Sequence, residues 1–217
     1  MRFINKEHRN KEFDKYILEC QPNSWKNVIT AKKLTLHKHL WVEQKGLCIY
    51  CEQAIPFKRQ KSKNHPSHIE HVKPKGDERF KHLEFDQNNL AVSCNGSDCH
   101  LKEVNENNFC GHIKDRAGRD HIYDEQLFLH PFENKDIENC FAYDMDGNIT
   151  AANETEKADY TINLLELQHP DLIDMRRTQY QIFLEEMANG EDVNDLLNNN
   201  VSELPSFYSM LKNFFVL

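Results

Sequence analysis

Two cysteines separated by two residues, Cys48 and Cys51 in "CIYC", have a spacing typical of metal ligands. A tight turn between such cysteines directs both thiolates at one tetrahedral ion about 2.3 Å from each sulfur. A second pair is needed to close the site, and the later segment "SCNGSDCHLKEVNENNFCGHIKD" offers Cys94 with either Cys99 or Cys110. Redox pairs of this spacing normally follow a strand in a βαβ unit, which is absent here, so we expect a closed structural zinc site.

A Glu-His pair, Glu70 and His71, lies between the two halves of this expected zinc site. Ile69 and Val72 alternate with the polar pair, and Pro74 follows, which predicts a short strand that ends in a loop. A lone histidine is more often structural than catalytic. Here the neighbouring carboxylate of Glu70, and the cysteines that precede and follow the pair in the sequence, favour a functional role for His71.

The chain has a cysteine pair, then Glu-His, then Asn-Leu, then a cysteine, and then a histidine close to a lysine. This order resembles the HNH endonuclease motif, whose fold is the ββα-metal finger. The segments "CIYCE", "HIEHVKPK", "NNLAVSCNG", "CGHIKD" and "TINLLELQHPDLIDMRR" are similar to the PtuB-type HNH effectors of the Septu and retron anti-phage systems. The similarity runs from about Leu40 to Arg177. It implies a metal-dependent endonuclease that hydrolyses DNA phosphodiester bonds, as the nuclease subunit of a bacterial defence complex.

The resemblance also implies a role for each matching residue. His71 would be the general base that takes a proton from the water attacking phosphorus, a task that suits imidazole at neutral pH. Glu70 would help to hold one catalytic Mg²⁺ or Mn²⁺, which prefers oxygen ligands. Asn89 would be the central Asn, whose amide orients the loop or the His71 ring. A PtuA-type ATPase is the implied partner, with a retron reverse transcriptase and its DNA as a further candidate.

The third motif residue, a second ligand of the catalytic metal, has two possible positions. In "CHLKE" it would be His100 after Cys99, and in "CGHIKD" it would be His112 after Cys110. We prefer Cys110 with His112 because the Cys-Gly-x-x-Lys form fits the subfamily, which makes residues 95–109 an inserted loop. Cys99 with His100 remains the alternative.

The charge distribution bears on a nucleic-acid partner. The net charge is −8, and residues 150–217 alone contain twelve acids and four bases, a balance of −8. The segment from Pro56 to His82, which surrounds the Glu-His pair, holds eight bases against three acids. These bases are Lys58, Arg59, Lys61, Lys63, Lys73, Lys75, Arg79 and Lys81. Lysine-rich loops often simply face water, but beside the expected base they favour contact with DNA phosphates, and the acidic C-terminal part favours a scaffold or protein contact.

Composition restricts the compartment. The chain has 217 residues, 39% of them hydrophobic, without an apolar run of membrane-spanning length or a signal-peptide core at the N-terminus. Seven cysteines, an odd number, suit a reducing environment better than a disulfide framework. We therefore expect a cytoplasmic protein with no membrane contact, in which Cys20 and Cys140 are ordinary core thiols.

Periodicity predicts an α+β, mostly helical fold: a ββα-metal finger with a structural zinc knuckle, flanked by helices at both ends. Residues 1–46 should be helical, with helices over about 7–20 and from Pro22 to Gly46. Residues 47–130 should form the metal-dependent core. Residues 131–217 should contain a hairpin turning at Asp146-Gly147, helices from about Thr155 to Gly190, and a buried apolar C-terminus.

Two other readings use the same residues. A non-catalytic zinc-ribbon adaptor that binds protein or nucleic acid would keep the cysteines but would not need Glu70, His71 and Asn89 in that order. A zinc hydrolase acting on small substrates would need an open three-ligand zinc site, whereas two cysteine pairs imply a closed one. We rank the adaptor second and the hydrolase last.

Overall fold

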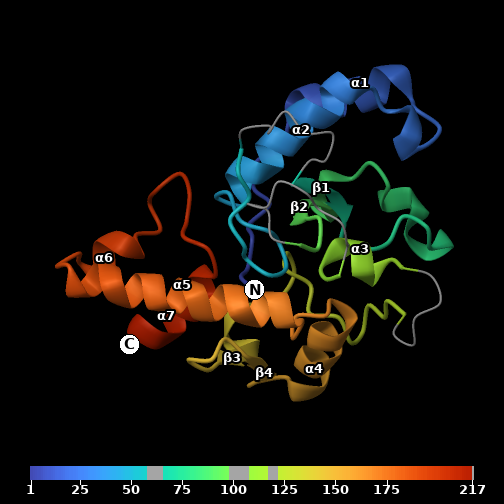
Figure 1. The fold of residues 1–217 in the computed structure, drawn as a ribbon. Coiled ribbons are helices and arrows are strands. Elements are labelled where there is room, and N and C mark those ends of the chain that lie inside the picture. The colour runs from blue at the N-terminus through green and yellow to red at the C-terminus, as the bar shows by residue number, and fades with distance from the viewer. Residues whose placement is uncertain (58–65, 98–107, 117–121, 217) are drawn as a thin grey trace.

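The computed structural model describes residues 1–57, 66–97, 108–116 and 122–216, and it has an α+β architecture (Figure 1). Strands form two separate two-stranded antiparallel sheets in the described part of the chain. The strands are β1 (Ser67–His71), β2 (Leu90–Cys94), β3 (Phe141–Tyr143) and β4 (Ile149–Ala151). The α-helices are α1 (Lys11–Cys20), α2 (Thr30–Glu43), α3 (Gly111–Lys114), α4 (Thr155–Leu164), α5 (Pro170–Ala188), α6 (Val193–Leu196) and α7 (Tyr208–Phe215).

The N-terminal helices match the predicted pattern in part. The helix expected over 7–20 is confirmed as α1, whose first turn is capped by the side chain of Asn10. The second helix begins at Thr30 instead of Pro22, because a short 3₁₀ turn and the extended backbone of Val28 and Ile29 precede it. The expectation that Cys20 is a core thiol is wrong: it ends α1 and is exposed.

The central sheet connects the predicted Glu-His pair on β1 to Cys94, a predicted zinc ligand, on β2. β1 and β2 pair antiparallel, so that His71 lies opposite Leu90 at one end and Ser67 lies opposite Cys94 at the other. Every residue of β2 is buried, and the side chain of Gln44, just after α2, binds the backbone of Val92 through both its oxygen and its nitrogen. The sheet is therefore fixed against the N-terminal helices by hydrogen bonds as well as by apolar packing.

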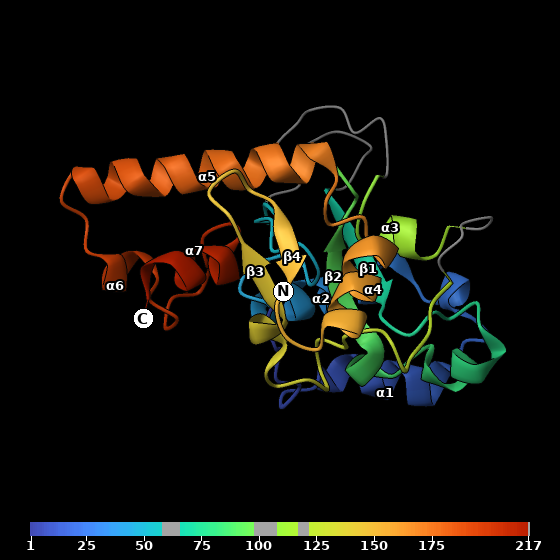
Figure 2. The same ribbon diagram turned by 90° about the horizontal axis from the view of Figure 1, so that it is seen from below.

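The C-terminal region contains the predicted hairpin and helices. β3 and β4 pair around a turn in which Gly147 has φ +91°, a conformation that favours glycine. α5 begins at Pro170 and ends at Ala188, as the pattern predicted. Phe207, Met210 and Leu211 are buried, whereas Phe214 and Phe215 are half-buried, which confirms in part the prediction that the apolar C-terminus is buried. In Figures 1 and 2, α5, α6 and α7 lie on one side of the β1–β2 sheet and α1 on the other.

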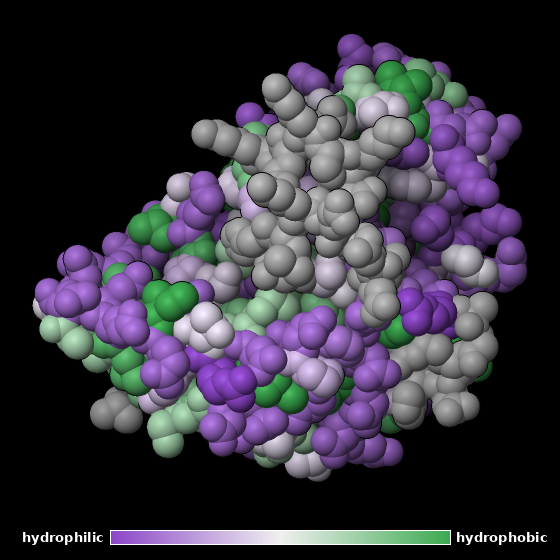
Figure 3. All heavy atoms as spheres, in the orientation of Figure 1, coloured by the Kyte–Doolittle hydropathy of each residue, from purple (hydrophilic) through white to green (hydrophobic). Residues whose placement is uncertain are grey.

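Hydrophilic residues cover most of the described surface in Figure 3, and the hydrophobic residues there form separate patches. Large apolar side chains that stay exposed, such as Leu18, Ile122 and Met145, come from different parts of the chain. Within the described residues, no helix has both the length and the apolar character that crossing a membrane requires.

Candidate metal centre

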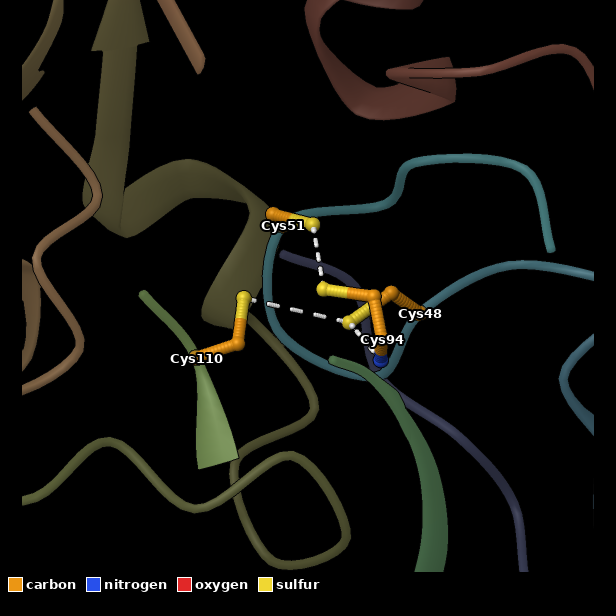
Figure 4. A group of neighbouring side chains, drawn as sticks. All are labelled: Cys48, Cys51, Cys94 and Cys110. Atoms are coloured by element: carbon orange, nitrogen blue, oxygen red, sulfur yellow. Dashed lines mark hydrogen bonds between the residues drawn. The ribbon is translucent and has the colours of Figure 1, made fainter. Parts of the chain in front are cut away.

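Four cysteines from three distant segments meet at one point in the core (Figure 4). Cys48 and Cys51 lie in the turn after α2, Cys94 ends β2, and Cys110 directly precedes α3. Their Sγ atoms all lie within 4.8 Å of one another, and all four residues are buried. The alternative ligand Cys99 and its neighbour His100 lie outside the described residues.

The geometry of these sulfurs suits a tetrahedral ion. The Sγ atoms of Cys51 and Cys94 are 3.8 Å apart, and those of Cys48 and Cys110 are 3.9 Å apart. A tetrahedron with metal–sulfur bonds of ~2.3 Å has edges of about 3.8 Å. Four buried thiolates with no open position are the donor set of a structural zinc site, so this cluster can hold zinc.

Backbone hydrogen bonds hold the cysteines in place without metal. The turn at the first pair is closed by hydrogen bonds from the amide of Glu52 to the Cys48 carbonyl and from the amide of Cys48 to the Gln53 carbonyl. Cys110 adopts φ +63° and donates its amide to the carbonyl of Leu165, at 2.8 Å. The segments around the cluster are therefore positioned partly by contacts that need no ion.

The thiols differ in their tendency to ionise. Burial raises the pKa of Cys51 and of Cys110 well above the ordinary value. Burial also opposes ionisation of Cys48, but hydrogen bonds from the thiols of Cys110, Cys51 and Cys94 outweigh it and lower the pKa of Cys48 well below the ordinary value. A bound cation is needed to keep several thiolates ionised together.

The predicted Glu-His pair is divided between the two faces of its strand. Successive side chains of a strand point to opposite sides, so Glu70 shares a face with His68, and His71 lies on the other. Both Glu70 and His71 are buried, at 3% and 1% exposed. The sequence led us to expect the two side chains at a common site, and this alternation separates them.

Glu70 is the centre of a buried polar network. Its Oε1 accepts a hydrogen bond from the Tyr50 hydroxyl at 3.0 Å and is 3.1 Å from Nζ of Lys114, and its Oε2 is 3.1 Å from Nε2 of His68. Lys114 also contacts the Asp115 carboxylate at 2.6 Å and donates to the His71 carbonyl. Burial favours the neutral acid, but the charges of Lys114 and His68 hold the pKa of Glu70 well below its ordinary value.

His71 has one occupied ring nitrogen and one without a partner. Nε2 is 3.0 Å from the backbone carbonyl of Glu84, so Nε2 carries the proton and donates it. Nδ1 is buried and has no hydrogen-bond partner in the part of the chain that the structure describes. The ring meets that of Trp25 edge to face at 4.9 Å. Burial and the charge of Lys75 lower the pKa of His71 to about 4, so the imidazole is neutral at pH 7.

Asn89 fixes the loop that follows His71. Its Oδ1 accepts a hydrogen bond from the amide of Lys73 at 2.7 Å, and its Nδ2 donates to the carbonyl of the same residue at 3.0 Å. The Asn89 backbone carbonyl also accepts from the amide of Val72. Of the two roles that the resemblance implied for this amide, these contacts correspond to orienting the loop.

His112 lies on α3 beside His68, with ring centroids 4.1 Å apart. Its Nε2 is 3.3 Å from Oδ1 of Asn95. Burial and the neighbouring His68 lower the pKa of His112 to about 4. Among the described histidines, cysteines and carboxylates, only the four cysteines group closely enough to hold a metal, so Glu70, His71 and His112 do not converge on a second ion here.

Sequence reasoning missed His68. It connects Glu70 to Asn95, whose Oδ1 is 3.0 Å from His68 Nδ1. Its position two residues before Glu70 on the same strand was the available signal, because alternate residues share a face.

The fold and the site define an α+β protein with a buried four-cysteine centre joined to a polar network. In comparisons with known proteins, no family model and no curated protein matches this chain.

Proposed function

We propose that this protein is a metal-dependent HNH endonuclease that hydrolyses DNA phosphodiester bonds, and that it is the nuclease subunit of a bacterial anti-phage defence complex. The observation that carries the proposal is the state of His71. A backbone carbonyl holds its Nε2–H, Nδ1 keeps an unused lone pair, and Asn89 fixes the loop immediately after it. A general base needs an acceptor nitrogen that can take a proton, and it works best with a pKa near the operating pH. The pKa of His71, lowered to about 4, would therefore have to rise when an anionic DNA phosphate binds beside it.

In this proposal, Nδ1 of His71 accepts a proton from the water that attacks phosphorus, and the Glu84 carbonyl holds the ring in orientation. Because Nδ1 is buried, the water reaches it only when surrounding side chains, including that of Trp25, move aside. Binding of DNA is the step that we expect to move them.

A divalent ion would supply charge stabilisation at the phosphate and the leaving oxygen. Glu70 and His112 are the residues that would hold it: Glu70 would supply a carboxylate oxygen, which Mg²⁺ and Mn²⁺ prefer, and His112 a neutral imidazole, a ligand better suited to softer transition metals than to Mg²⁺. Glu70 is now neutralised by Lys114 at 3.1 Å, so an ion at this carboxylate has to displace the ammonium group.

Basic side chains beside the site support contact with DNA. Lys75, Arg79 and Lys81 are exposed in the segment after β1, whereas Lys73 is half-buried and pairs with Glu133 at 3.1 Å. The other four bases of the predicted run, between Lys58 and Lys63, lie outside the described residues. Phosphate binding by such cations weakens as salt rises. The acidic C-terminal helices repel DNA, so we assign them to scaffolding or to docking the PtuA-type ATPase, with a retron reverse transcriptase complex as a further partner.

The test is a plasmid-nicking assay with zinc-loaded protein and added Mg²⁺ or Mn²⁺, with and without chelator. Wild type should nick the plasmid only with the added metal, and His71→Ala should lower the rate by about 10²-fold or more. His8→Ala removes an exposed histidine far along the chain and should leave the rate unchanged. Equal rates for wild type and His71→Ala would exclude His71 as the base and with it this proposal.

A non-catalytic zinc-ribbon adaptor is the second candidate, and the Glu70 network favours it. The carboxylate is already satisfied by Tyr50, His68 and Lys114, which is how a structural residue is expected to look. The same assay separates the two functions. An adaptor shows no metal-dependent nicking by wild type, and its His71→Ala variant retains DNA or protein binding.

A further inference from the structure

Arg176, in the middle of α5, is buried with very few polar contacts. It is 1% exposed, and its Nη1 donates to the carbonyl of Gly147 at 3.2 Å. Its Nε has no partner, and no described carboxylate lies within ion-pair distance of it. The rings of Tyr143 and Phe207 lie 5.9 and 5.8 Å from the guanidinium carbon. The immediate surroundings therefore leave a full positive charge in the core without an ionic partner.

An unpaired buried charge costs several kcal/mol, so a cation kept in a core is expected to have an anion nearby. Glu52 is the carboxylate whose charge reaches Arg176. Its oxygens already accept from the amide and hydroxyl of Ser209 at 2.8 and 2.7 Å, and they lie 3.5 Å from the α-amino group of Met1. Glu52 is thus largely neutralised by other groups.

The four-cysteine cluster is the other source of negative charge near α5. Gln53, two residues after Cys51, contacts the sulfur of Met175, the neighbour of Arg176. Phe207, whose ring lies 5.8 Å from the guanidinium carbon of Arg176, donates its amide to the carbonyl of Glu52, the residue that follows Cys51, at 2.8 Å. These contacts place the guanidinium beside the segment that carries the first cysteine pair. In agreement with this placement, burial lowers the pKa of Arg176, whereas the charges of Tyr143, Cys51 and Cys110 raise it.

We infer that Arg176 is the buried counter-charge of the four-thiolate metal site. A divalent zinc ion held by four thiolates carries two net negative charges, which a low-dielectric core does not tolerate without a nearby cation. Arg176 partly balances that charge. The negative charge of the metal site in turn stabilises the buried guanidinium. It acts on the site through charge at a distance and is not itself a ligand.

This arrangement couples the metal to the packing of the C-terminal region. Arg176 is hydrogen-bonded to the turn between β3 and β4, and that turn is pressed against α5, since a Cβ on Gly147 would lie 2.2 Å from the Ile173 carbonyl oxygen. Metal bound at the cysteines therefore favours the packed position of Arg176, and hence of α5 on the hairpin. This coupling does not depend on nuclease activity.

The experiment measures zinc affinity of the full chain by competition with a chromophoric chelator. Arg176→Met keeps much of the side-chain volume without charge, Arg176→Gln keeps an N–H group for Gly147, and Arg176→Lys keeps the charge. Arg177→Met is the matched control, because Arg177 is the next residue of α5, is 49% exposed and pairs with Asp174. Cobalt-loaded samples report through their thiolate charge-transfer band whether all four sulfurs still bind.

The two neutral variants should bind zinc at least about tenfold more weakly while keeping the four-thiolate cobalt spectrum. Arg176→Lys should stay within about threefold of wild type, and Arg177→Met should match wild type. Neutral variants that fold only poorly beside a well-folded, zinc-binding Arg176→Lys would also support the inference. Wild-type affinity in the neutral variants, or an Arg176→Lys variant as impaired as they are, would overturn it.

Discussion

The carboxylate of Glu70 occupies the space that a side chain at position 111 would need. A Cβ built on Gly111 would lie 2.5 Å from Oε2 of Glu70, a distance at which something must move. Gly111 therefore allows α3 to approach β1 closely enough for Lys114 to reach Glu70. The glycine after Cys110 thus has a packing reason in this fold, in addition to its place in the resembled motif.

Gly111→Ala should destabilise the zinc-loaded protein by about 1–3 kcal/mol, the usual cost of inserting an atom into a filled core. The measurement is the free energy of unfolding by urea. Gly76→Ala is the control, because a Cβ at Gly76 would meet nothing within 4 Å, and it should have little effect. Equal stability of the two variants would mean that the contact between Gly111 and Glu70 relaxes without cost.

Zinc binding should depend on Cys110 and not on the cysteines outside the cluster. Cys110→Ser should lower the zinc content from about one ion per chain towards zero, because it removes one of four thiolate ligands. Zinc content by elemental analysis of purified protein is the measurement. Cys20→Ser, at an exposed position, should retain the ion, and we expect the same of Cys99→Ser. Loss of zinc from Cys99→Ser but not from Cys110→Ser would reverse our preferred ligand set.

The cysteine cluster was the part of the site that the sequence predicted best. Two pairs of cysteines at metal-ligand spacing are typical of zinc sites, so residue type and order restricted the choice of the fourth ligand to Cys110 or Cys99. The strand at Glu70 and the hairpin at Gly147 followed from equally local patterns. These features are encoded by neighbours in the chain, which is why they are readable without a structure.

The burial of charged side chains could not be predicted from local sequence in the same way. Lys114 was considered only as the lysine of a motif, and Arg176 only as part of a resembled segment and as one of four bases in an acidic region. Nothing in their neighbours along the chain distinguishes a lysine or arginine in the core from one in water, because their partners come from other segments. The separation of Glu70 from His71 was available from strand alternation, but the resemblance to the HNH motif led us to place both at one site.

Asn89 should matter for stability because it is buried and bonded twice to the backbone of Lys73. Asn89→Ala leaves the partly buried amide N–H and carbonyl of Lys73 without these partners, which should cost about 1–3 kcal/mol of unfolding free energy. Chemical denaturation measures the effect. Asn88→Ala is the neighbouring control, since Asn88 is exposed, and it should be close to wild type. If His71 is the general base, Asn89→Ala should also slow plasmid nicking more than its loss of stability explains.

The pairing of Glu70 with Lys114 predicts that a second substitution, at Glu70, restores part of the stability lost by a first substitution at Lys114. Lys114→Met leaves the Glu70 carboxylate buried without its cation and should cost about 3–5 kcal/mol of unfolding free energy. Glu70→Gln made in the Lys114→Met background should recover a large part of that loss, because it removes the uncompensated charge, and Tyr50 and His68 can still bond to the amide. The measurement is urea unfolding of the four zinc-loaded proteins. Lys81→Met, which removes an exposed partner of Glu78, is the control and should change little. Additive losses in the double variant would show that the two charges do not depend on each other in the core.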